Sequence, residues 1–166
     1  VQYRHSSWSK NEGLPDPQVN AVLRTRDGFL WVGTRSGLAR FDGVRFTLFH
    51  SRHEPALRNE DIRCLAQDAA GVLWIGTADG LASYDGRFHW IASGDRDAGV
   101  QFESGPPLGQ VVVLCPDRRG NLWIGTANGL FRLRQRRIER IRYDGEASWR
   151  VWGIVEAVDS ALWLNQ

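Results

Sequence analysis

The chain has 166 residues, of which 42% are hydrophobic and 24% are charged, and its formal net charge is +2. This length and composition suit one ordinary globular domain and exclude a disordered, collagen-like or simple coiled-coil protein, while the balanced charge gives no support for a nucleic-acid partner. The longest purely apolar run, Val111 to Cys115, is far shorter than the ~18 residues that cross a membrane.

The first predicted element is a single strand at residues 1–8. Tyr3 precedes Val19 by sixteen residues, an interval that recurs before the next unit, so this segment matches the last strand of a repeated unit. A complete unit follows at residues 19–49. Its four strands are predicted at residues 19–23, 29–33, 38–41 and 44–49.

The same pattern then recurs along the chain. Trp31, Trp74 and Trp123 lie in near-copies of the phrase Leu-Trp-Val/Ile-Gly-Thr, which a Gly-Leu pair follows, and Trp163 lies in a fourth, partial copy. The spacings of 43, 49 and 40 residues suit either four-stranded propeller blades or paired-helix solenoids. Glycine-bearing turns every 8–10 residues leave room for short strands but not for helices, so they favour blades. Further units are predicted at residues 62–92, 111–143 and 151–166.

These units predict an all-β fold, a partial β-propeller of about three and a half four-stranded blades that occupies residues 1–166 as one domain. The second strand of each blade is apolar on both faces. In the first blade Trp31 lies on one face and Leu30 on the other, so neighbouring blades must cover this strand from both sides. We expect the chain to be a fragment of a seven-bladed ring, because an open-ended propeller leaves an apolar face uncovered at each end.

Glycines mark two further features of the blades. One glycine lies two residues after each repeated tryptophan and predicts a close approach by the neighbouring blade. Others belong to dipeptides such as Asp79-Gly80 and Asn128-Gly129, which are typical of tight hairpin turns whose two central residues both have positive φ. The structural positions of the repeat are therefore predicted to be Trp31, Gly33, Trp74, Gly76, Trp123, Gly125 and Trp163.

The motifs of the first unit stand in a characteristic order. They read Gly13-Leu14-Pro15, then Asp27-Gly28, then Leu30-Trp31-Val32-Gly33-Thr34, then Gly37-Leu38. This order resembles the bacterial two-component regulator propeller repeat, and the resemblance covers essentially the whole chain. It implies two consecutive seven-bladed propellers outside the inner membrane, followed by a small sandwich domain, one transmembrane helix and a cytoplasmic output module.

The resemblance implies a function as well as a fold. The propeller would be a non-catalytic, periplasmic, ligand-sensing segment of a receptor whose output is a histidine kinase, a diguanylate cyclase or a DNA-binding regulator. Its partners would be a small molecule, in some members a carbohydrate, and the remainder of its own propeller and receptor chain in a receptor dimer. No catalytic residue, cofactor, metal or nucleic acid is predicted for it.

A ligand would bind where successive blades present loops around the propeller axis. We expect the crossings between blades and the turns between second and third strands to share that face. The longest crossing, residues 92–110, is a candidate because long loops are often functional. Equivalent positions on this face carry different chemistry, as an asymmetric ligand requires. The candidate ligand-binding residues are Asn20, Arg35, Arg63, Asp79 and Asn128.

Other reactive chemistry is sparse in the sequence. His50, His53 and Glu54 could form a metal trio, but a three-residue spacing brings ligands together reliably only on a helix. Cys64 and Cys115 are too few for a disulfide framework or a zinc site. The arginine-rich run at residues 132–142 is predicted to form a solvated outer rim of the third blade.

Two other function classes stay open at this point. A propeller enzyme, such as a lyase or a quinone-dependent dehydrogenase, would need clustered His, Glu or metal-binding carboxylates near the axis. A protein-interaction scaffold of the WD-repeat type would show Trp-Asp strand endings and a Gly-His pair, and the sequence contains neither.

Overall fold

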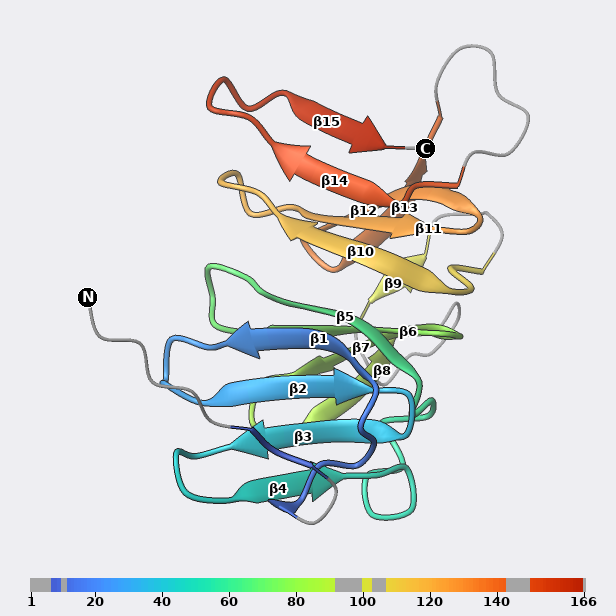
Figure 1. Cartoon of the computed structure of the whole chain (residues 1–166). Helices are drawn as coiled ribbons and strands as arrows, with labels where there is room; N and C mark the ends of the chain where they lie inside the picture. Colours follow the sequence, from blue (N-terminus) through green and yellow to red (C-terminus); the bar gives the residue numbers. More distant parts are fainter. Residues whose placement is uncertain (1–6, 10–11, 92–99, 103–106, 143–149, 166) are drawn as a thin grey trace.

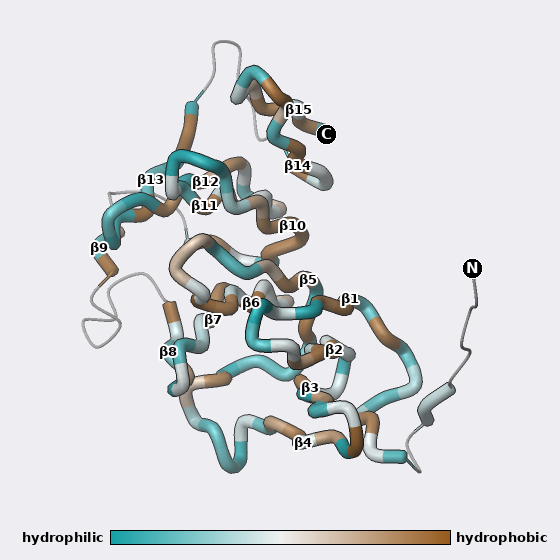
Figure 2. Tube along the Cα trace, turned by 90° about the vertical axis from the view of Figure 1, so that its left-hand side faces the viewer, coloured by the Kyte–Doolittle hydropathy of each residue, from teal (hydrophilic) through white to brown (hydrophobic). Residues whose placement is uncertain are grey.

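The computed structural model describes residues 7–9, 12–91, 100–102, 107–142 and 150–165. The regular elements in these residues are all β-strands, arranged as four sheets that follow one another in chain order (Figure 1). The predicted all-β partial propeller is therefore confirmed. A view turned by 90° shows the sheets as successive layers, with hydrophilic residues in many of the turns (Figure 2).

The first two sheets have four strands each, and their strands pair antiparallel in simple sequential order. The first sheet contains β1 (Val19–Arg24), β2 (Leu30–Thr34), β3 (Gly37–Phe41) and β4 (Phe46–Phe49). The second sheet contains β5 (Ile62–Gln67), β6 (Leu73–Thr77), β7 (Gly80–Tyr84) and β8 (Phe88–Ile91).

The third sheet has one strand more than predicted. Its expected strands are β10 (Val111–Pro116), β11 (Leu122–Thr126), β12 (Gly129–Arg134) and β13 (Arg137–Ile141). The additional strand, β9 (Gln101–Phe102), comes from the crossing at residues 92–110 and pairs parallel with β13 at the outer edge. It covers an edge that would otherwise expose unpaired backbone groups. The last sheet contains β14 (Gly153–Glu156) and β15 (Leu162–Asn165).

The segment before β1 covers part of the first sheet. The strand predicted at residues 1–8 lies mostly outside the described residues, and Trp8, which is described, is not in a strand. The Trp8 ring instead packs against Phe41 and Phe46, with ring centroids 5.3 and 6.2 Å away. Leu14 is buried in a small cluster with Val32 and Ala39. This segment therefore shields the face of the first sheet that points away from the second.

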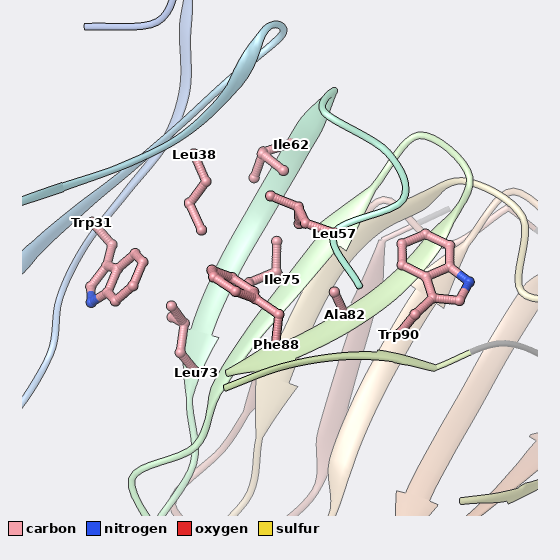
Figure 3. Packing of buried hydrophobic residues seen from close by; sticks show 9 residues of the cluster. All are labelled: Trp31, Leu38, Leu57, Ile62, Leu73, Ile75, Ala82, Phe88 and Trp90. Carbon is pink, nitrogen blue, oxygen red and sulfur yellow. The ribbon is translucent and has the colours of Figure 1, made fainter. Parts of the chain in front are cut away.

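The repeated tryptophans show how each sheet depends on the next. Trp31 is only 2% exposed and packs in a cluster that joins Leu38 of its own sheet to Leu73 of the following one (Figure 3). Its ring centroid lies 5.2 Å from that of Tyr84 in the second sheet. Trp163 occupies the equivalent position in the last sheet, where no described sheet follows, and is 71% exposed. The next layer therefore buries Trp31, whereas Trp74 and Trp123 are half-buried although a sheet follows each of them.

The glycine after each tryptophan provides the space for that contact. A Cβ atom on Gly33 would lie 2.5 Å from Ile62 of the next sheet, and one on Gly125 would lie 2.9 Å from the carbonyl oxygen of Val151. A Cβ atom on Gly76 would lie 2.3 Å from the sulfur of Cys64 in the same sheet, and it would also contact Val111 of the next sheet. Any larger residue would push the blades apart.

A buried threonine closes the turn between the second and third strands of each complete blade. In the first blade the Thr34 hydroxyl donates to the carbonyl of Gly37 at 2.9 Å and accepts from the backbone N–H of Ser36. Thr77 and Thr126 make the same pair of bonds. All three threonines are fully buried. The threonine of the repeated phrase is thus a turn clip.

The turns differ from the predicted hairpin type. Thr77 pairs with Gly80, so the two residues of the turn are Ala78 and Asp79, and Gly80 follows the turn. Gly80 has a positive φ of 142°, whereas Ala78 and Asp79 do not have positive φ. The prediction that Asp79-Gly80 and Asn128-Gly129 form the centres of type I′ turns is therefore wrong, because the threonine clip holds a different turn. Within the described residues, a type I′ geometry occurs in the third sheet, where Gln135 and Arg136 have φ of 49° and 64°.

Candidate functional site

The register of each sheet defines two opposite faces of the propeller. Val19 at the start of β1 pairs with Thr34 at the end of β2, and Ile62 and Val111 pair likewise with Thr77 and Thr126. The crossings between blades therefore lie beside the turns after the second strands, and we call this the crossing face. The loop face carries the loops after the first strands (residues 25–29, 68–72 and 117–121) and the turns after the third strands (residues 42–45, 85–87 and 135–136).

Two of the candidate ligand residues occupy β-bulges on the crossing face. The register shifts between Val19 and Ala21, and again between Ile62 and Cys64, so Asn20 and Arg63 are the extra residues. Bulges change the direction of a side chain and are common beside functional sites. The sequence alone offered no signal for these bulges, because they depend on the pairing with the neighbouring strand.

These two side chains make different contacts. The Asn20 amide donates to the carbonyl of Ile62 at 2.9 Å and so ties the first sheet to the second. Arg63 Nη2 donates to Asp61 Oδ2 at 2.6 Å. Two further atoms of that ion pair, Arg63 Nε and Asp61 Oδ1, are buried without a hydrogen-bond partner among the described residues. The pair therefore keeps one donor and one acceptor unused on the crossing face.

The other three candidates do not join them. Arg35 and Asp79 are exposed at the tips of their turns. The Asn128 amide donates to the carbonyl of Pro107 at 2.9 Å and so fastens the crossing that precedes β10. None of the five predicted residues lines either of the cavities of the loop face.

Two cavities of about 340 Å³ each open on the loop face between consecutive sheets. The cavity between the first and second sheets is lined by Trp31, Arg40 and Tyr84 among others. The cavity between the second and third sheets, here called the interblade cleft, is lined on one side by Trp74, Asp85 and His89. Its other side is formed by Leu122, Leu133, Arg134, Gln135 and Arg136.

The acidic side chains of the interblade cleft have partners within their own sheet. Asp68 accepts from the backbone N–H of Val72 at 3.0 Å and from the Trp74 indole at 2.8 Å. Asp85 lies 3.1 Å from His89 Nε2. Burial alone would raise the pKa of the Asp85 carboxyl, but its hydrogen bonds with His89 and the backbone of Arg87 outweigh that effect and lower it.

The bond between aspartate and indole recurs in the third sheet. Asp117 Oδ2 accepts from the Trp123 indole at 2.8 Å, and Oδ1 accepts from the backbone N–H of Asn121 at the same distance. An aspartate stands six residues before the tryptophan in both units, and this spacing is the sequence signal of a pair that the predicted site residues did not include. Burial raises the pKa of Asp117, but the hydrogen bonds from Asn121, Trp123 and Arg119 outweigh burial and lower it.

We expect Asp117→Asn to lower the free energy of unfolding by about 1 kcal/mol at neutral pH, since it weakens hydrogen bonds to a charged acceptor. The pKa of Asp117 is lower in the folded chain than the ~3.9 of an unfolded one, so the carboxylate stabilises the fold above pH ~4 and loses this effect as the pH falls through the folded-state pKa. Urea unfolding from pH 7 downward should therefore show the stabilities of the two proteins converging below pH ~4.

Asp159→Asn is the control, because Asp159 caps an exposed turn without an indole partner. A difference that stays constant with pH contradicts this role.

The two cysteines are packing residues. Cys64 lies against Gly76, with its thiol 3.9 Å from the carbonyl of Val111, and burial raises its pKa to about 12. Burial also raises the pKa of the Cys115 thiol, which packs between the third and fourth sheets. Both thiols are free, and the raised pKa of each disfavours the reactive thiolate.

The described part of the chain has neither a metal-binding cluster nor a membrane-spanning helix. No group of three or more His, Cys, Asp or Glu side chains there could hold a metal ion, and His5 lies outside it. No helix in that part is long and apolar enough to cross a membrane.

The arginine-rich run of the third sheet is partly engaged and partly exposed. Arg132 pairs with Glu139 and lies over the Trp123 ring, whereas Arg134, Arg136 and Arg137 are exposed.

The fold and its repeated contacts define a sector of a β-propeller whose blades share one tryptophan, glycine and threonine pattern. Residues 13–36, 56–79 and 105–128 match the family described as two component regulator propeller. These three segments thus match the repeat that the sequence motifs predicted. None of the curated proteins compared with the chain matches it.

Solved structures with the same fold come from different functional contexts. The extracellular domain of a putative hybrid two component system from B. thetaiotaomicron matches with a TM-score of 0.79 at 22% identity, over 96% of this chain and 23% of that one. Virginiamycin B lyase from Staphylococcus aureus matches with a TM-score of 0.63 at 13% identity, over 89% of this chain and 48% of the lyase. These likenesses show the fold alone, and the chain spans less than half of either protein.

Proposed function

We propose that the chain is a sector of the ligand-sensing propeller of a membrane-bound two-component regulator, located outside the cytoplasm. The three family repeats carry this proposal. The exposed Trp163 supports the idea of a sector, because its equivalent Trp31 is buried by a following sheet. In this role the chain has no catalytic activity of its own and packs against the remainder of its propeller.

The crossing face is the proposed sensing surface. The Arg63 side chain, which is paired with Asp61, is 34% exposed there, and the exposed part of its guanidinium could bond to a polar small molecule such as a carbohydrate. Binding would act by favouring one of two arrangements of a receptor dimer, in proportion to the ligand's difference in affinity for them. The output module of the parent would be a histidine kinase or a diguanylate cyclase.

The location is tested by reporter fusions in the full-length protein. Alkaline phosphatase, which is active only outside the cytoplasm, is inserted after Gln166, and β-galactosidase, which is active only inside it, is inserted at the same point. We expect phosphatase activity alone. Galactosidase activity alone would overturn the proposed location. The complete reading frame should also encode a membrane-spanning helix and an output module after the propeller, and their absence would overturn the regulator assignment.

A further inference from the structure

The interblade cleft has the size and the mixed lining of a small-molecule site. Its volume of about 340 Å³ lies at the lower end of the ~300–1,000 Å³ typical of ligand pockets. It opens on the loop face, away from the crossing face to which the sensing proposal applies. The described residues that line it come from the second and third sheets and from the loops and the crossing beside them.

The inner part of the cleft is apolar. Ile91 and Val100 line it together with Leu122 and Leu133, and the Trp74 ring adds an aromatic surface. Leu122 and Leu133 are opposite each other in the β11–β12 register and are almost fully buried, so their positions are fixed. Such a lining favours the hydrocarbon or aromatic body of a ligand over a sugar.

Among the described residues, the arginines of the cleft have no polar side-chain partner, whereas its aspartates do. Asp68 bonds to Val72 and Trp74, and Asp85 bonds to His89. Arg134 and Arg136 line the same cleft, and neither guanidinium makes a hydrogen bond or an ion pair within the described part of the chain. Two guanidinium groups beside the apolar part of a cavity are suited to one carboxylate, which they can bind with charge-assisted hydrogen bonds.

The backbone that carries these arginines is in an unusual conformation. Gln135 and Arg136 form the turn between β12 and β13 with φ of 49° and 64°, although neither is a glycine. Backbone in the left-handed region is unfavourable for such residues and collects at functional sites. Here the type I′ turn places residues 134–136 together at the cleft.

We propose that the interblade cleft binds a small organic carboxylate with an apolar or aromatic body. The carboxylate lies between Arg134 and Arg136, and the apolar body lies against Leu122, Leu133 and the Trp74 ring. This is a second site, distinct from the crossing face, and it does not require the sensor role. It binds its ligand without any covalent step.

The test measures binding of matched probes to the full-length protein by titration calorimetry. The probes are 3-phenylpropionate, its neutral analogue 3-phenylpropanol and its cationic analogue 3-phenylpropylamine. We expect the carboxylate to bind at least tenfold more tightly than either analogue, because only the carboxylate accepts charge-assisted bonds. Equal binding of all three probes, tighter binding of the amine, or no binding of the carboxylate at millimolar concentration overturns the proposal.

Two variants locate the binding. Arg136→Gln should weaken 3-phenylpropionate at least tenfold. Arg137→Gln is the matched control, because Arg137 is exposed next to the same turn but does not line the cleft. Its affinity should equal that of the unaltered protein, and equal losses in both variants would overturn the assignment to the cleft. The reporter fusions test the sensor proposal separately, so either proposal can fail alone.

Discussion

Trp31→Ala is expected to lower the free energy of unfolding of the 166-residue chain by about 3–5 kcal/mol, the usual range for removing a buried tryptophan from a core. The indole lies between two sheets, in a cluster with Leu38 and Leu73 and in ring contact with Phe49 and Tyr84. Its loss leaves a cavity where the first and second blades meet. Urea unfolding followed by far-ultraviolet circular dichroism measures the change.

Trp163→Ala is the matched control for that substitution. Trp163 holds the same place in its repeat but is 71% exposed, so its removal should change the stability of the 166-residue chain by less than ~0.5 kcal/mol. In the full-length protein the proposed next blade covers this indole, and the same substitution should cost about as much as Trp31→Ala. Equal effects of Trp31→Ala and Trp163→Ala in the 166-residue chain would contradict burial by the following layer.

The repeat made most of the fold predictable. Each blade carries its own strand pattern and its own turns in about forty to fifty contiguous residues. The pairings within a blade join neighbouring strands, so local sequence is enough to define them. The burial of Trp31 follows from the same repetition, because a strand that is apolar on both faces needs a neighbour on each side.

Features that depend on pairing or on contacts between blades could not be predicted. Strand β9 has two residues and pairs with Arg137 and Ile138, more than thirty residues away, so it has no periodicity of its own. The turn at Ala78-Asp79 is set by the Thr77 hydroxyl rather than by the preference of the Asp-Gly dipeptide. In both cases a specific contact decides the local conformation.

The candidate sites likewise combine positions that the repeat predicts with features that depend on strand pairing or on contacts between blades. Arg63 could be proposed from its position in the repeat, but its bulge and its bond to Asp61 follow from the pairing of β5 with β6. The interblade cleft joins Asp85 and His89 of one blade to Arg136 of the next, and no motif links these residues in the sequence. A repeat identifies equivalent positions within blades, whereas a cavity between blades depends on how two different sheets meet.

Gly76→Ala is expected to destabilise the chain by close to 3 kcal/mol, the upper end of the ~1–3 kcal/mol usual for overpacking a core. The added Cβ would lie 2.3 Å from the Cys64 sulfur and 2.8 Å from Val111 of the next sheet, so both the second blade and its neighbour must move. Gly153→Ala is the control, because its nearest neighbour, Asn165 Cβ, would be 3.3 Å away. Urea unfolding should show a small effect there.

Cys64→Ala, combined with Gly76→Ala, separates the two contacts at Gly76. Removing the sulfur relieves the shorter contact within the second sheet but leaves the contact with Val111 across the blade interface. The double variant should therefore recover part of the stability lost by Gly76→Ala, and the remaining loss measures the cost of separating the two blades. Two losses that simply add would mean that the Cys64 sulfur does not limit the space at Gly76. A Gly76→Ala variant as stable as the unaltered chain would contradict the close packing of the blades, on which the burial of Trp31 and the walls of the interblade cleft both depend.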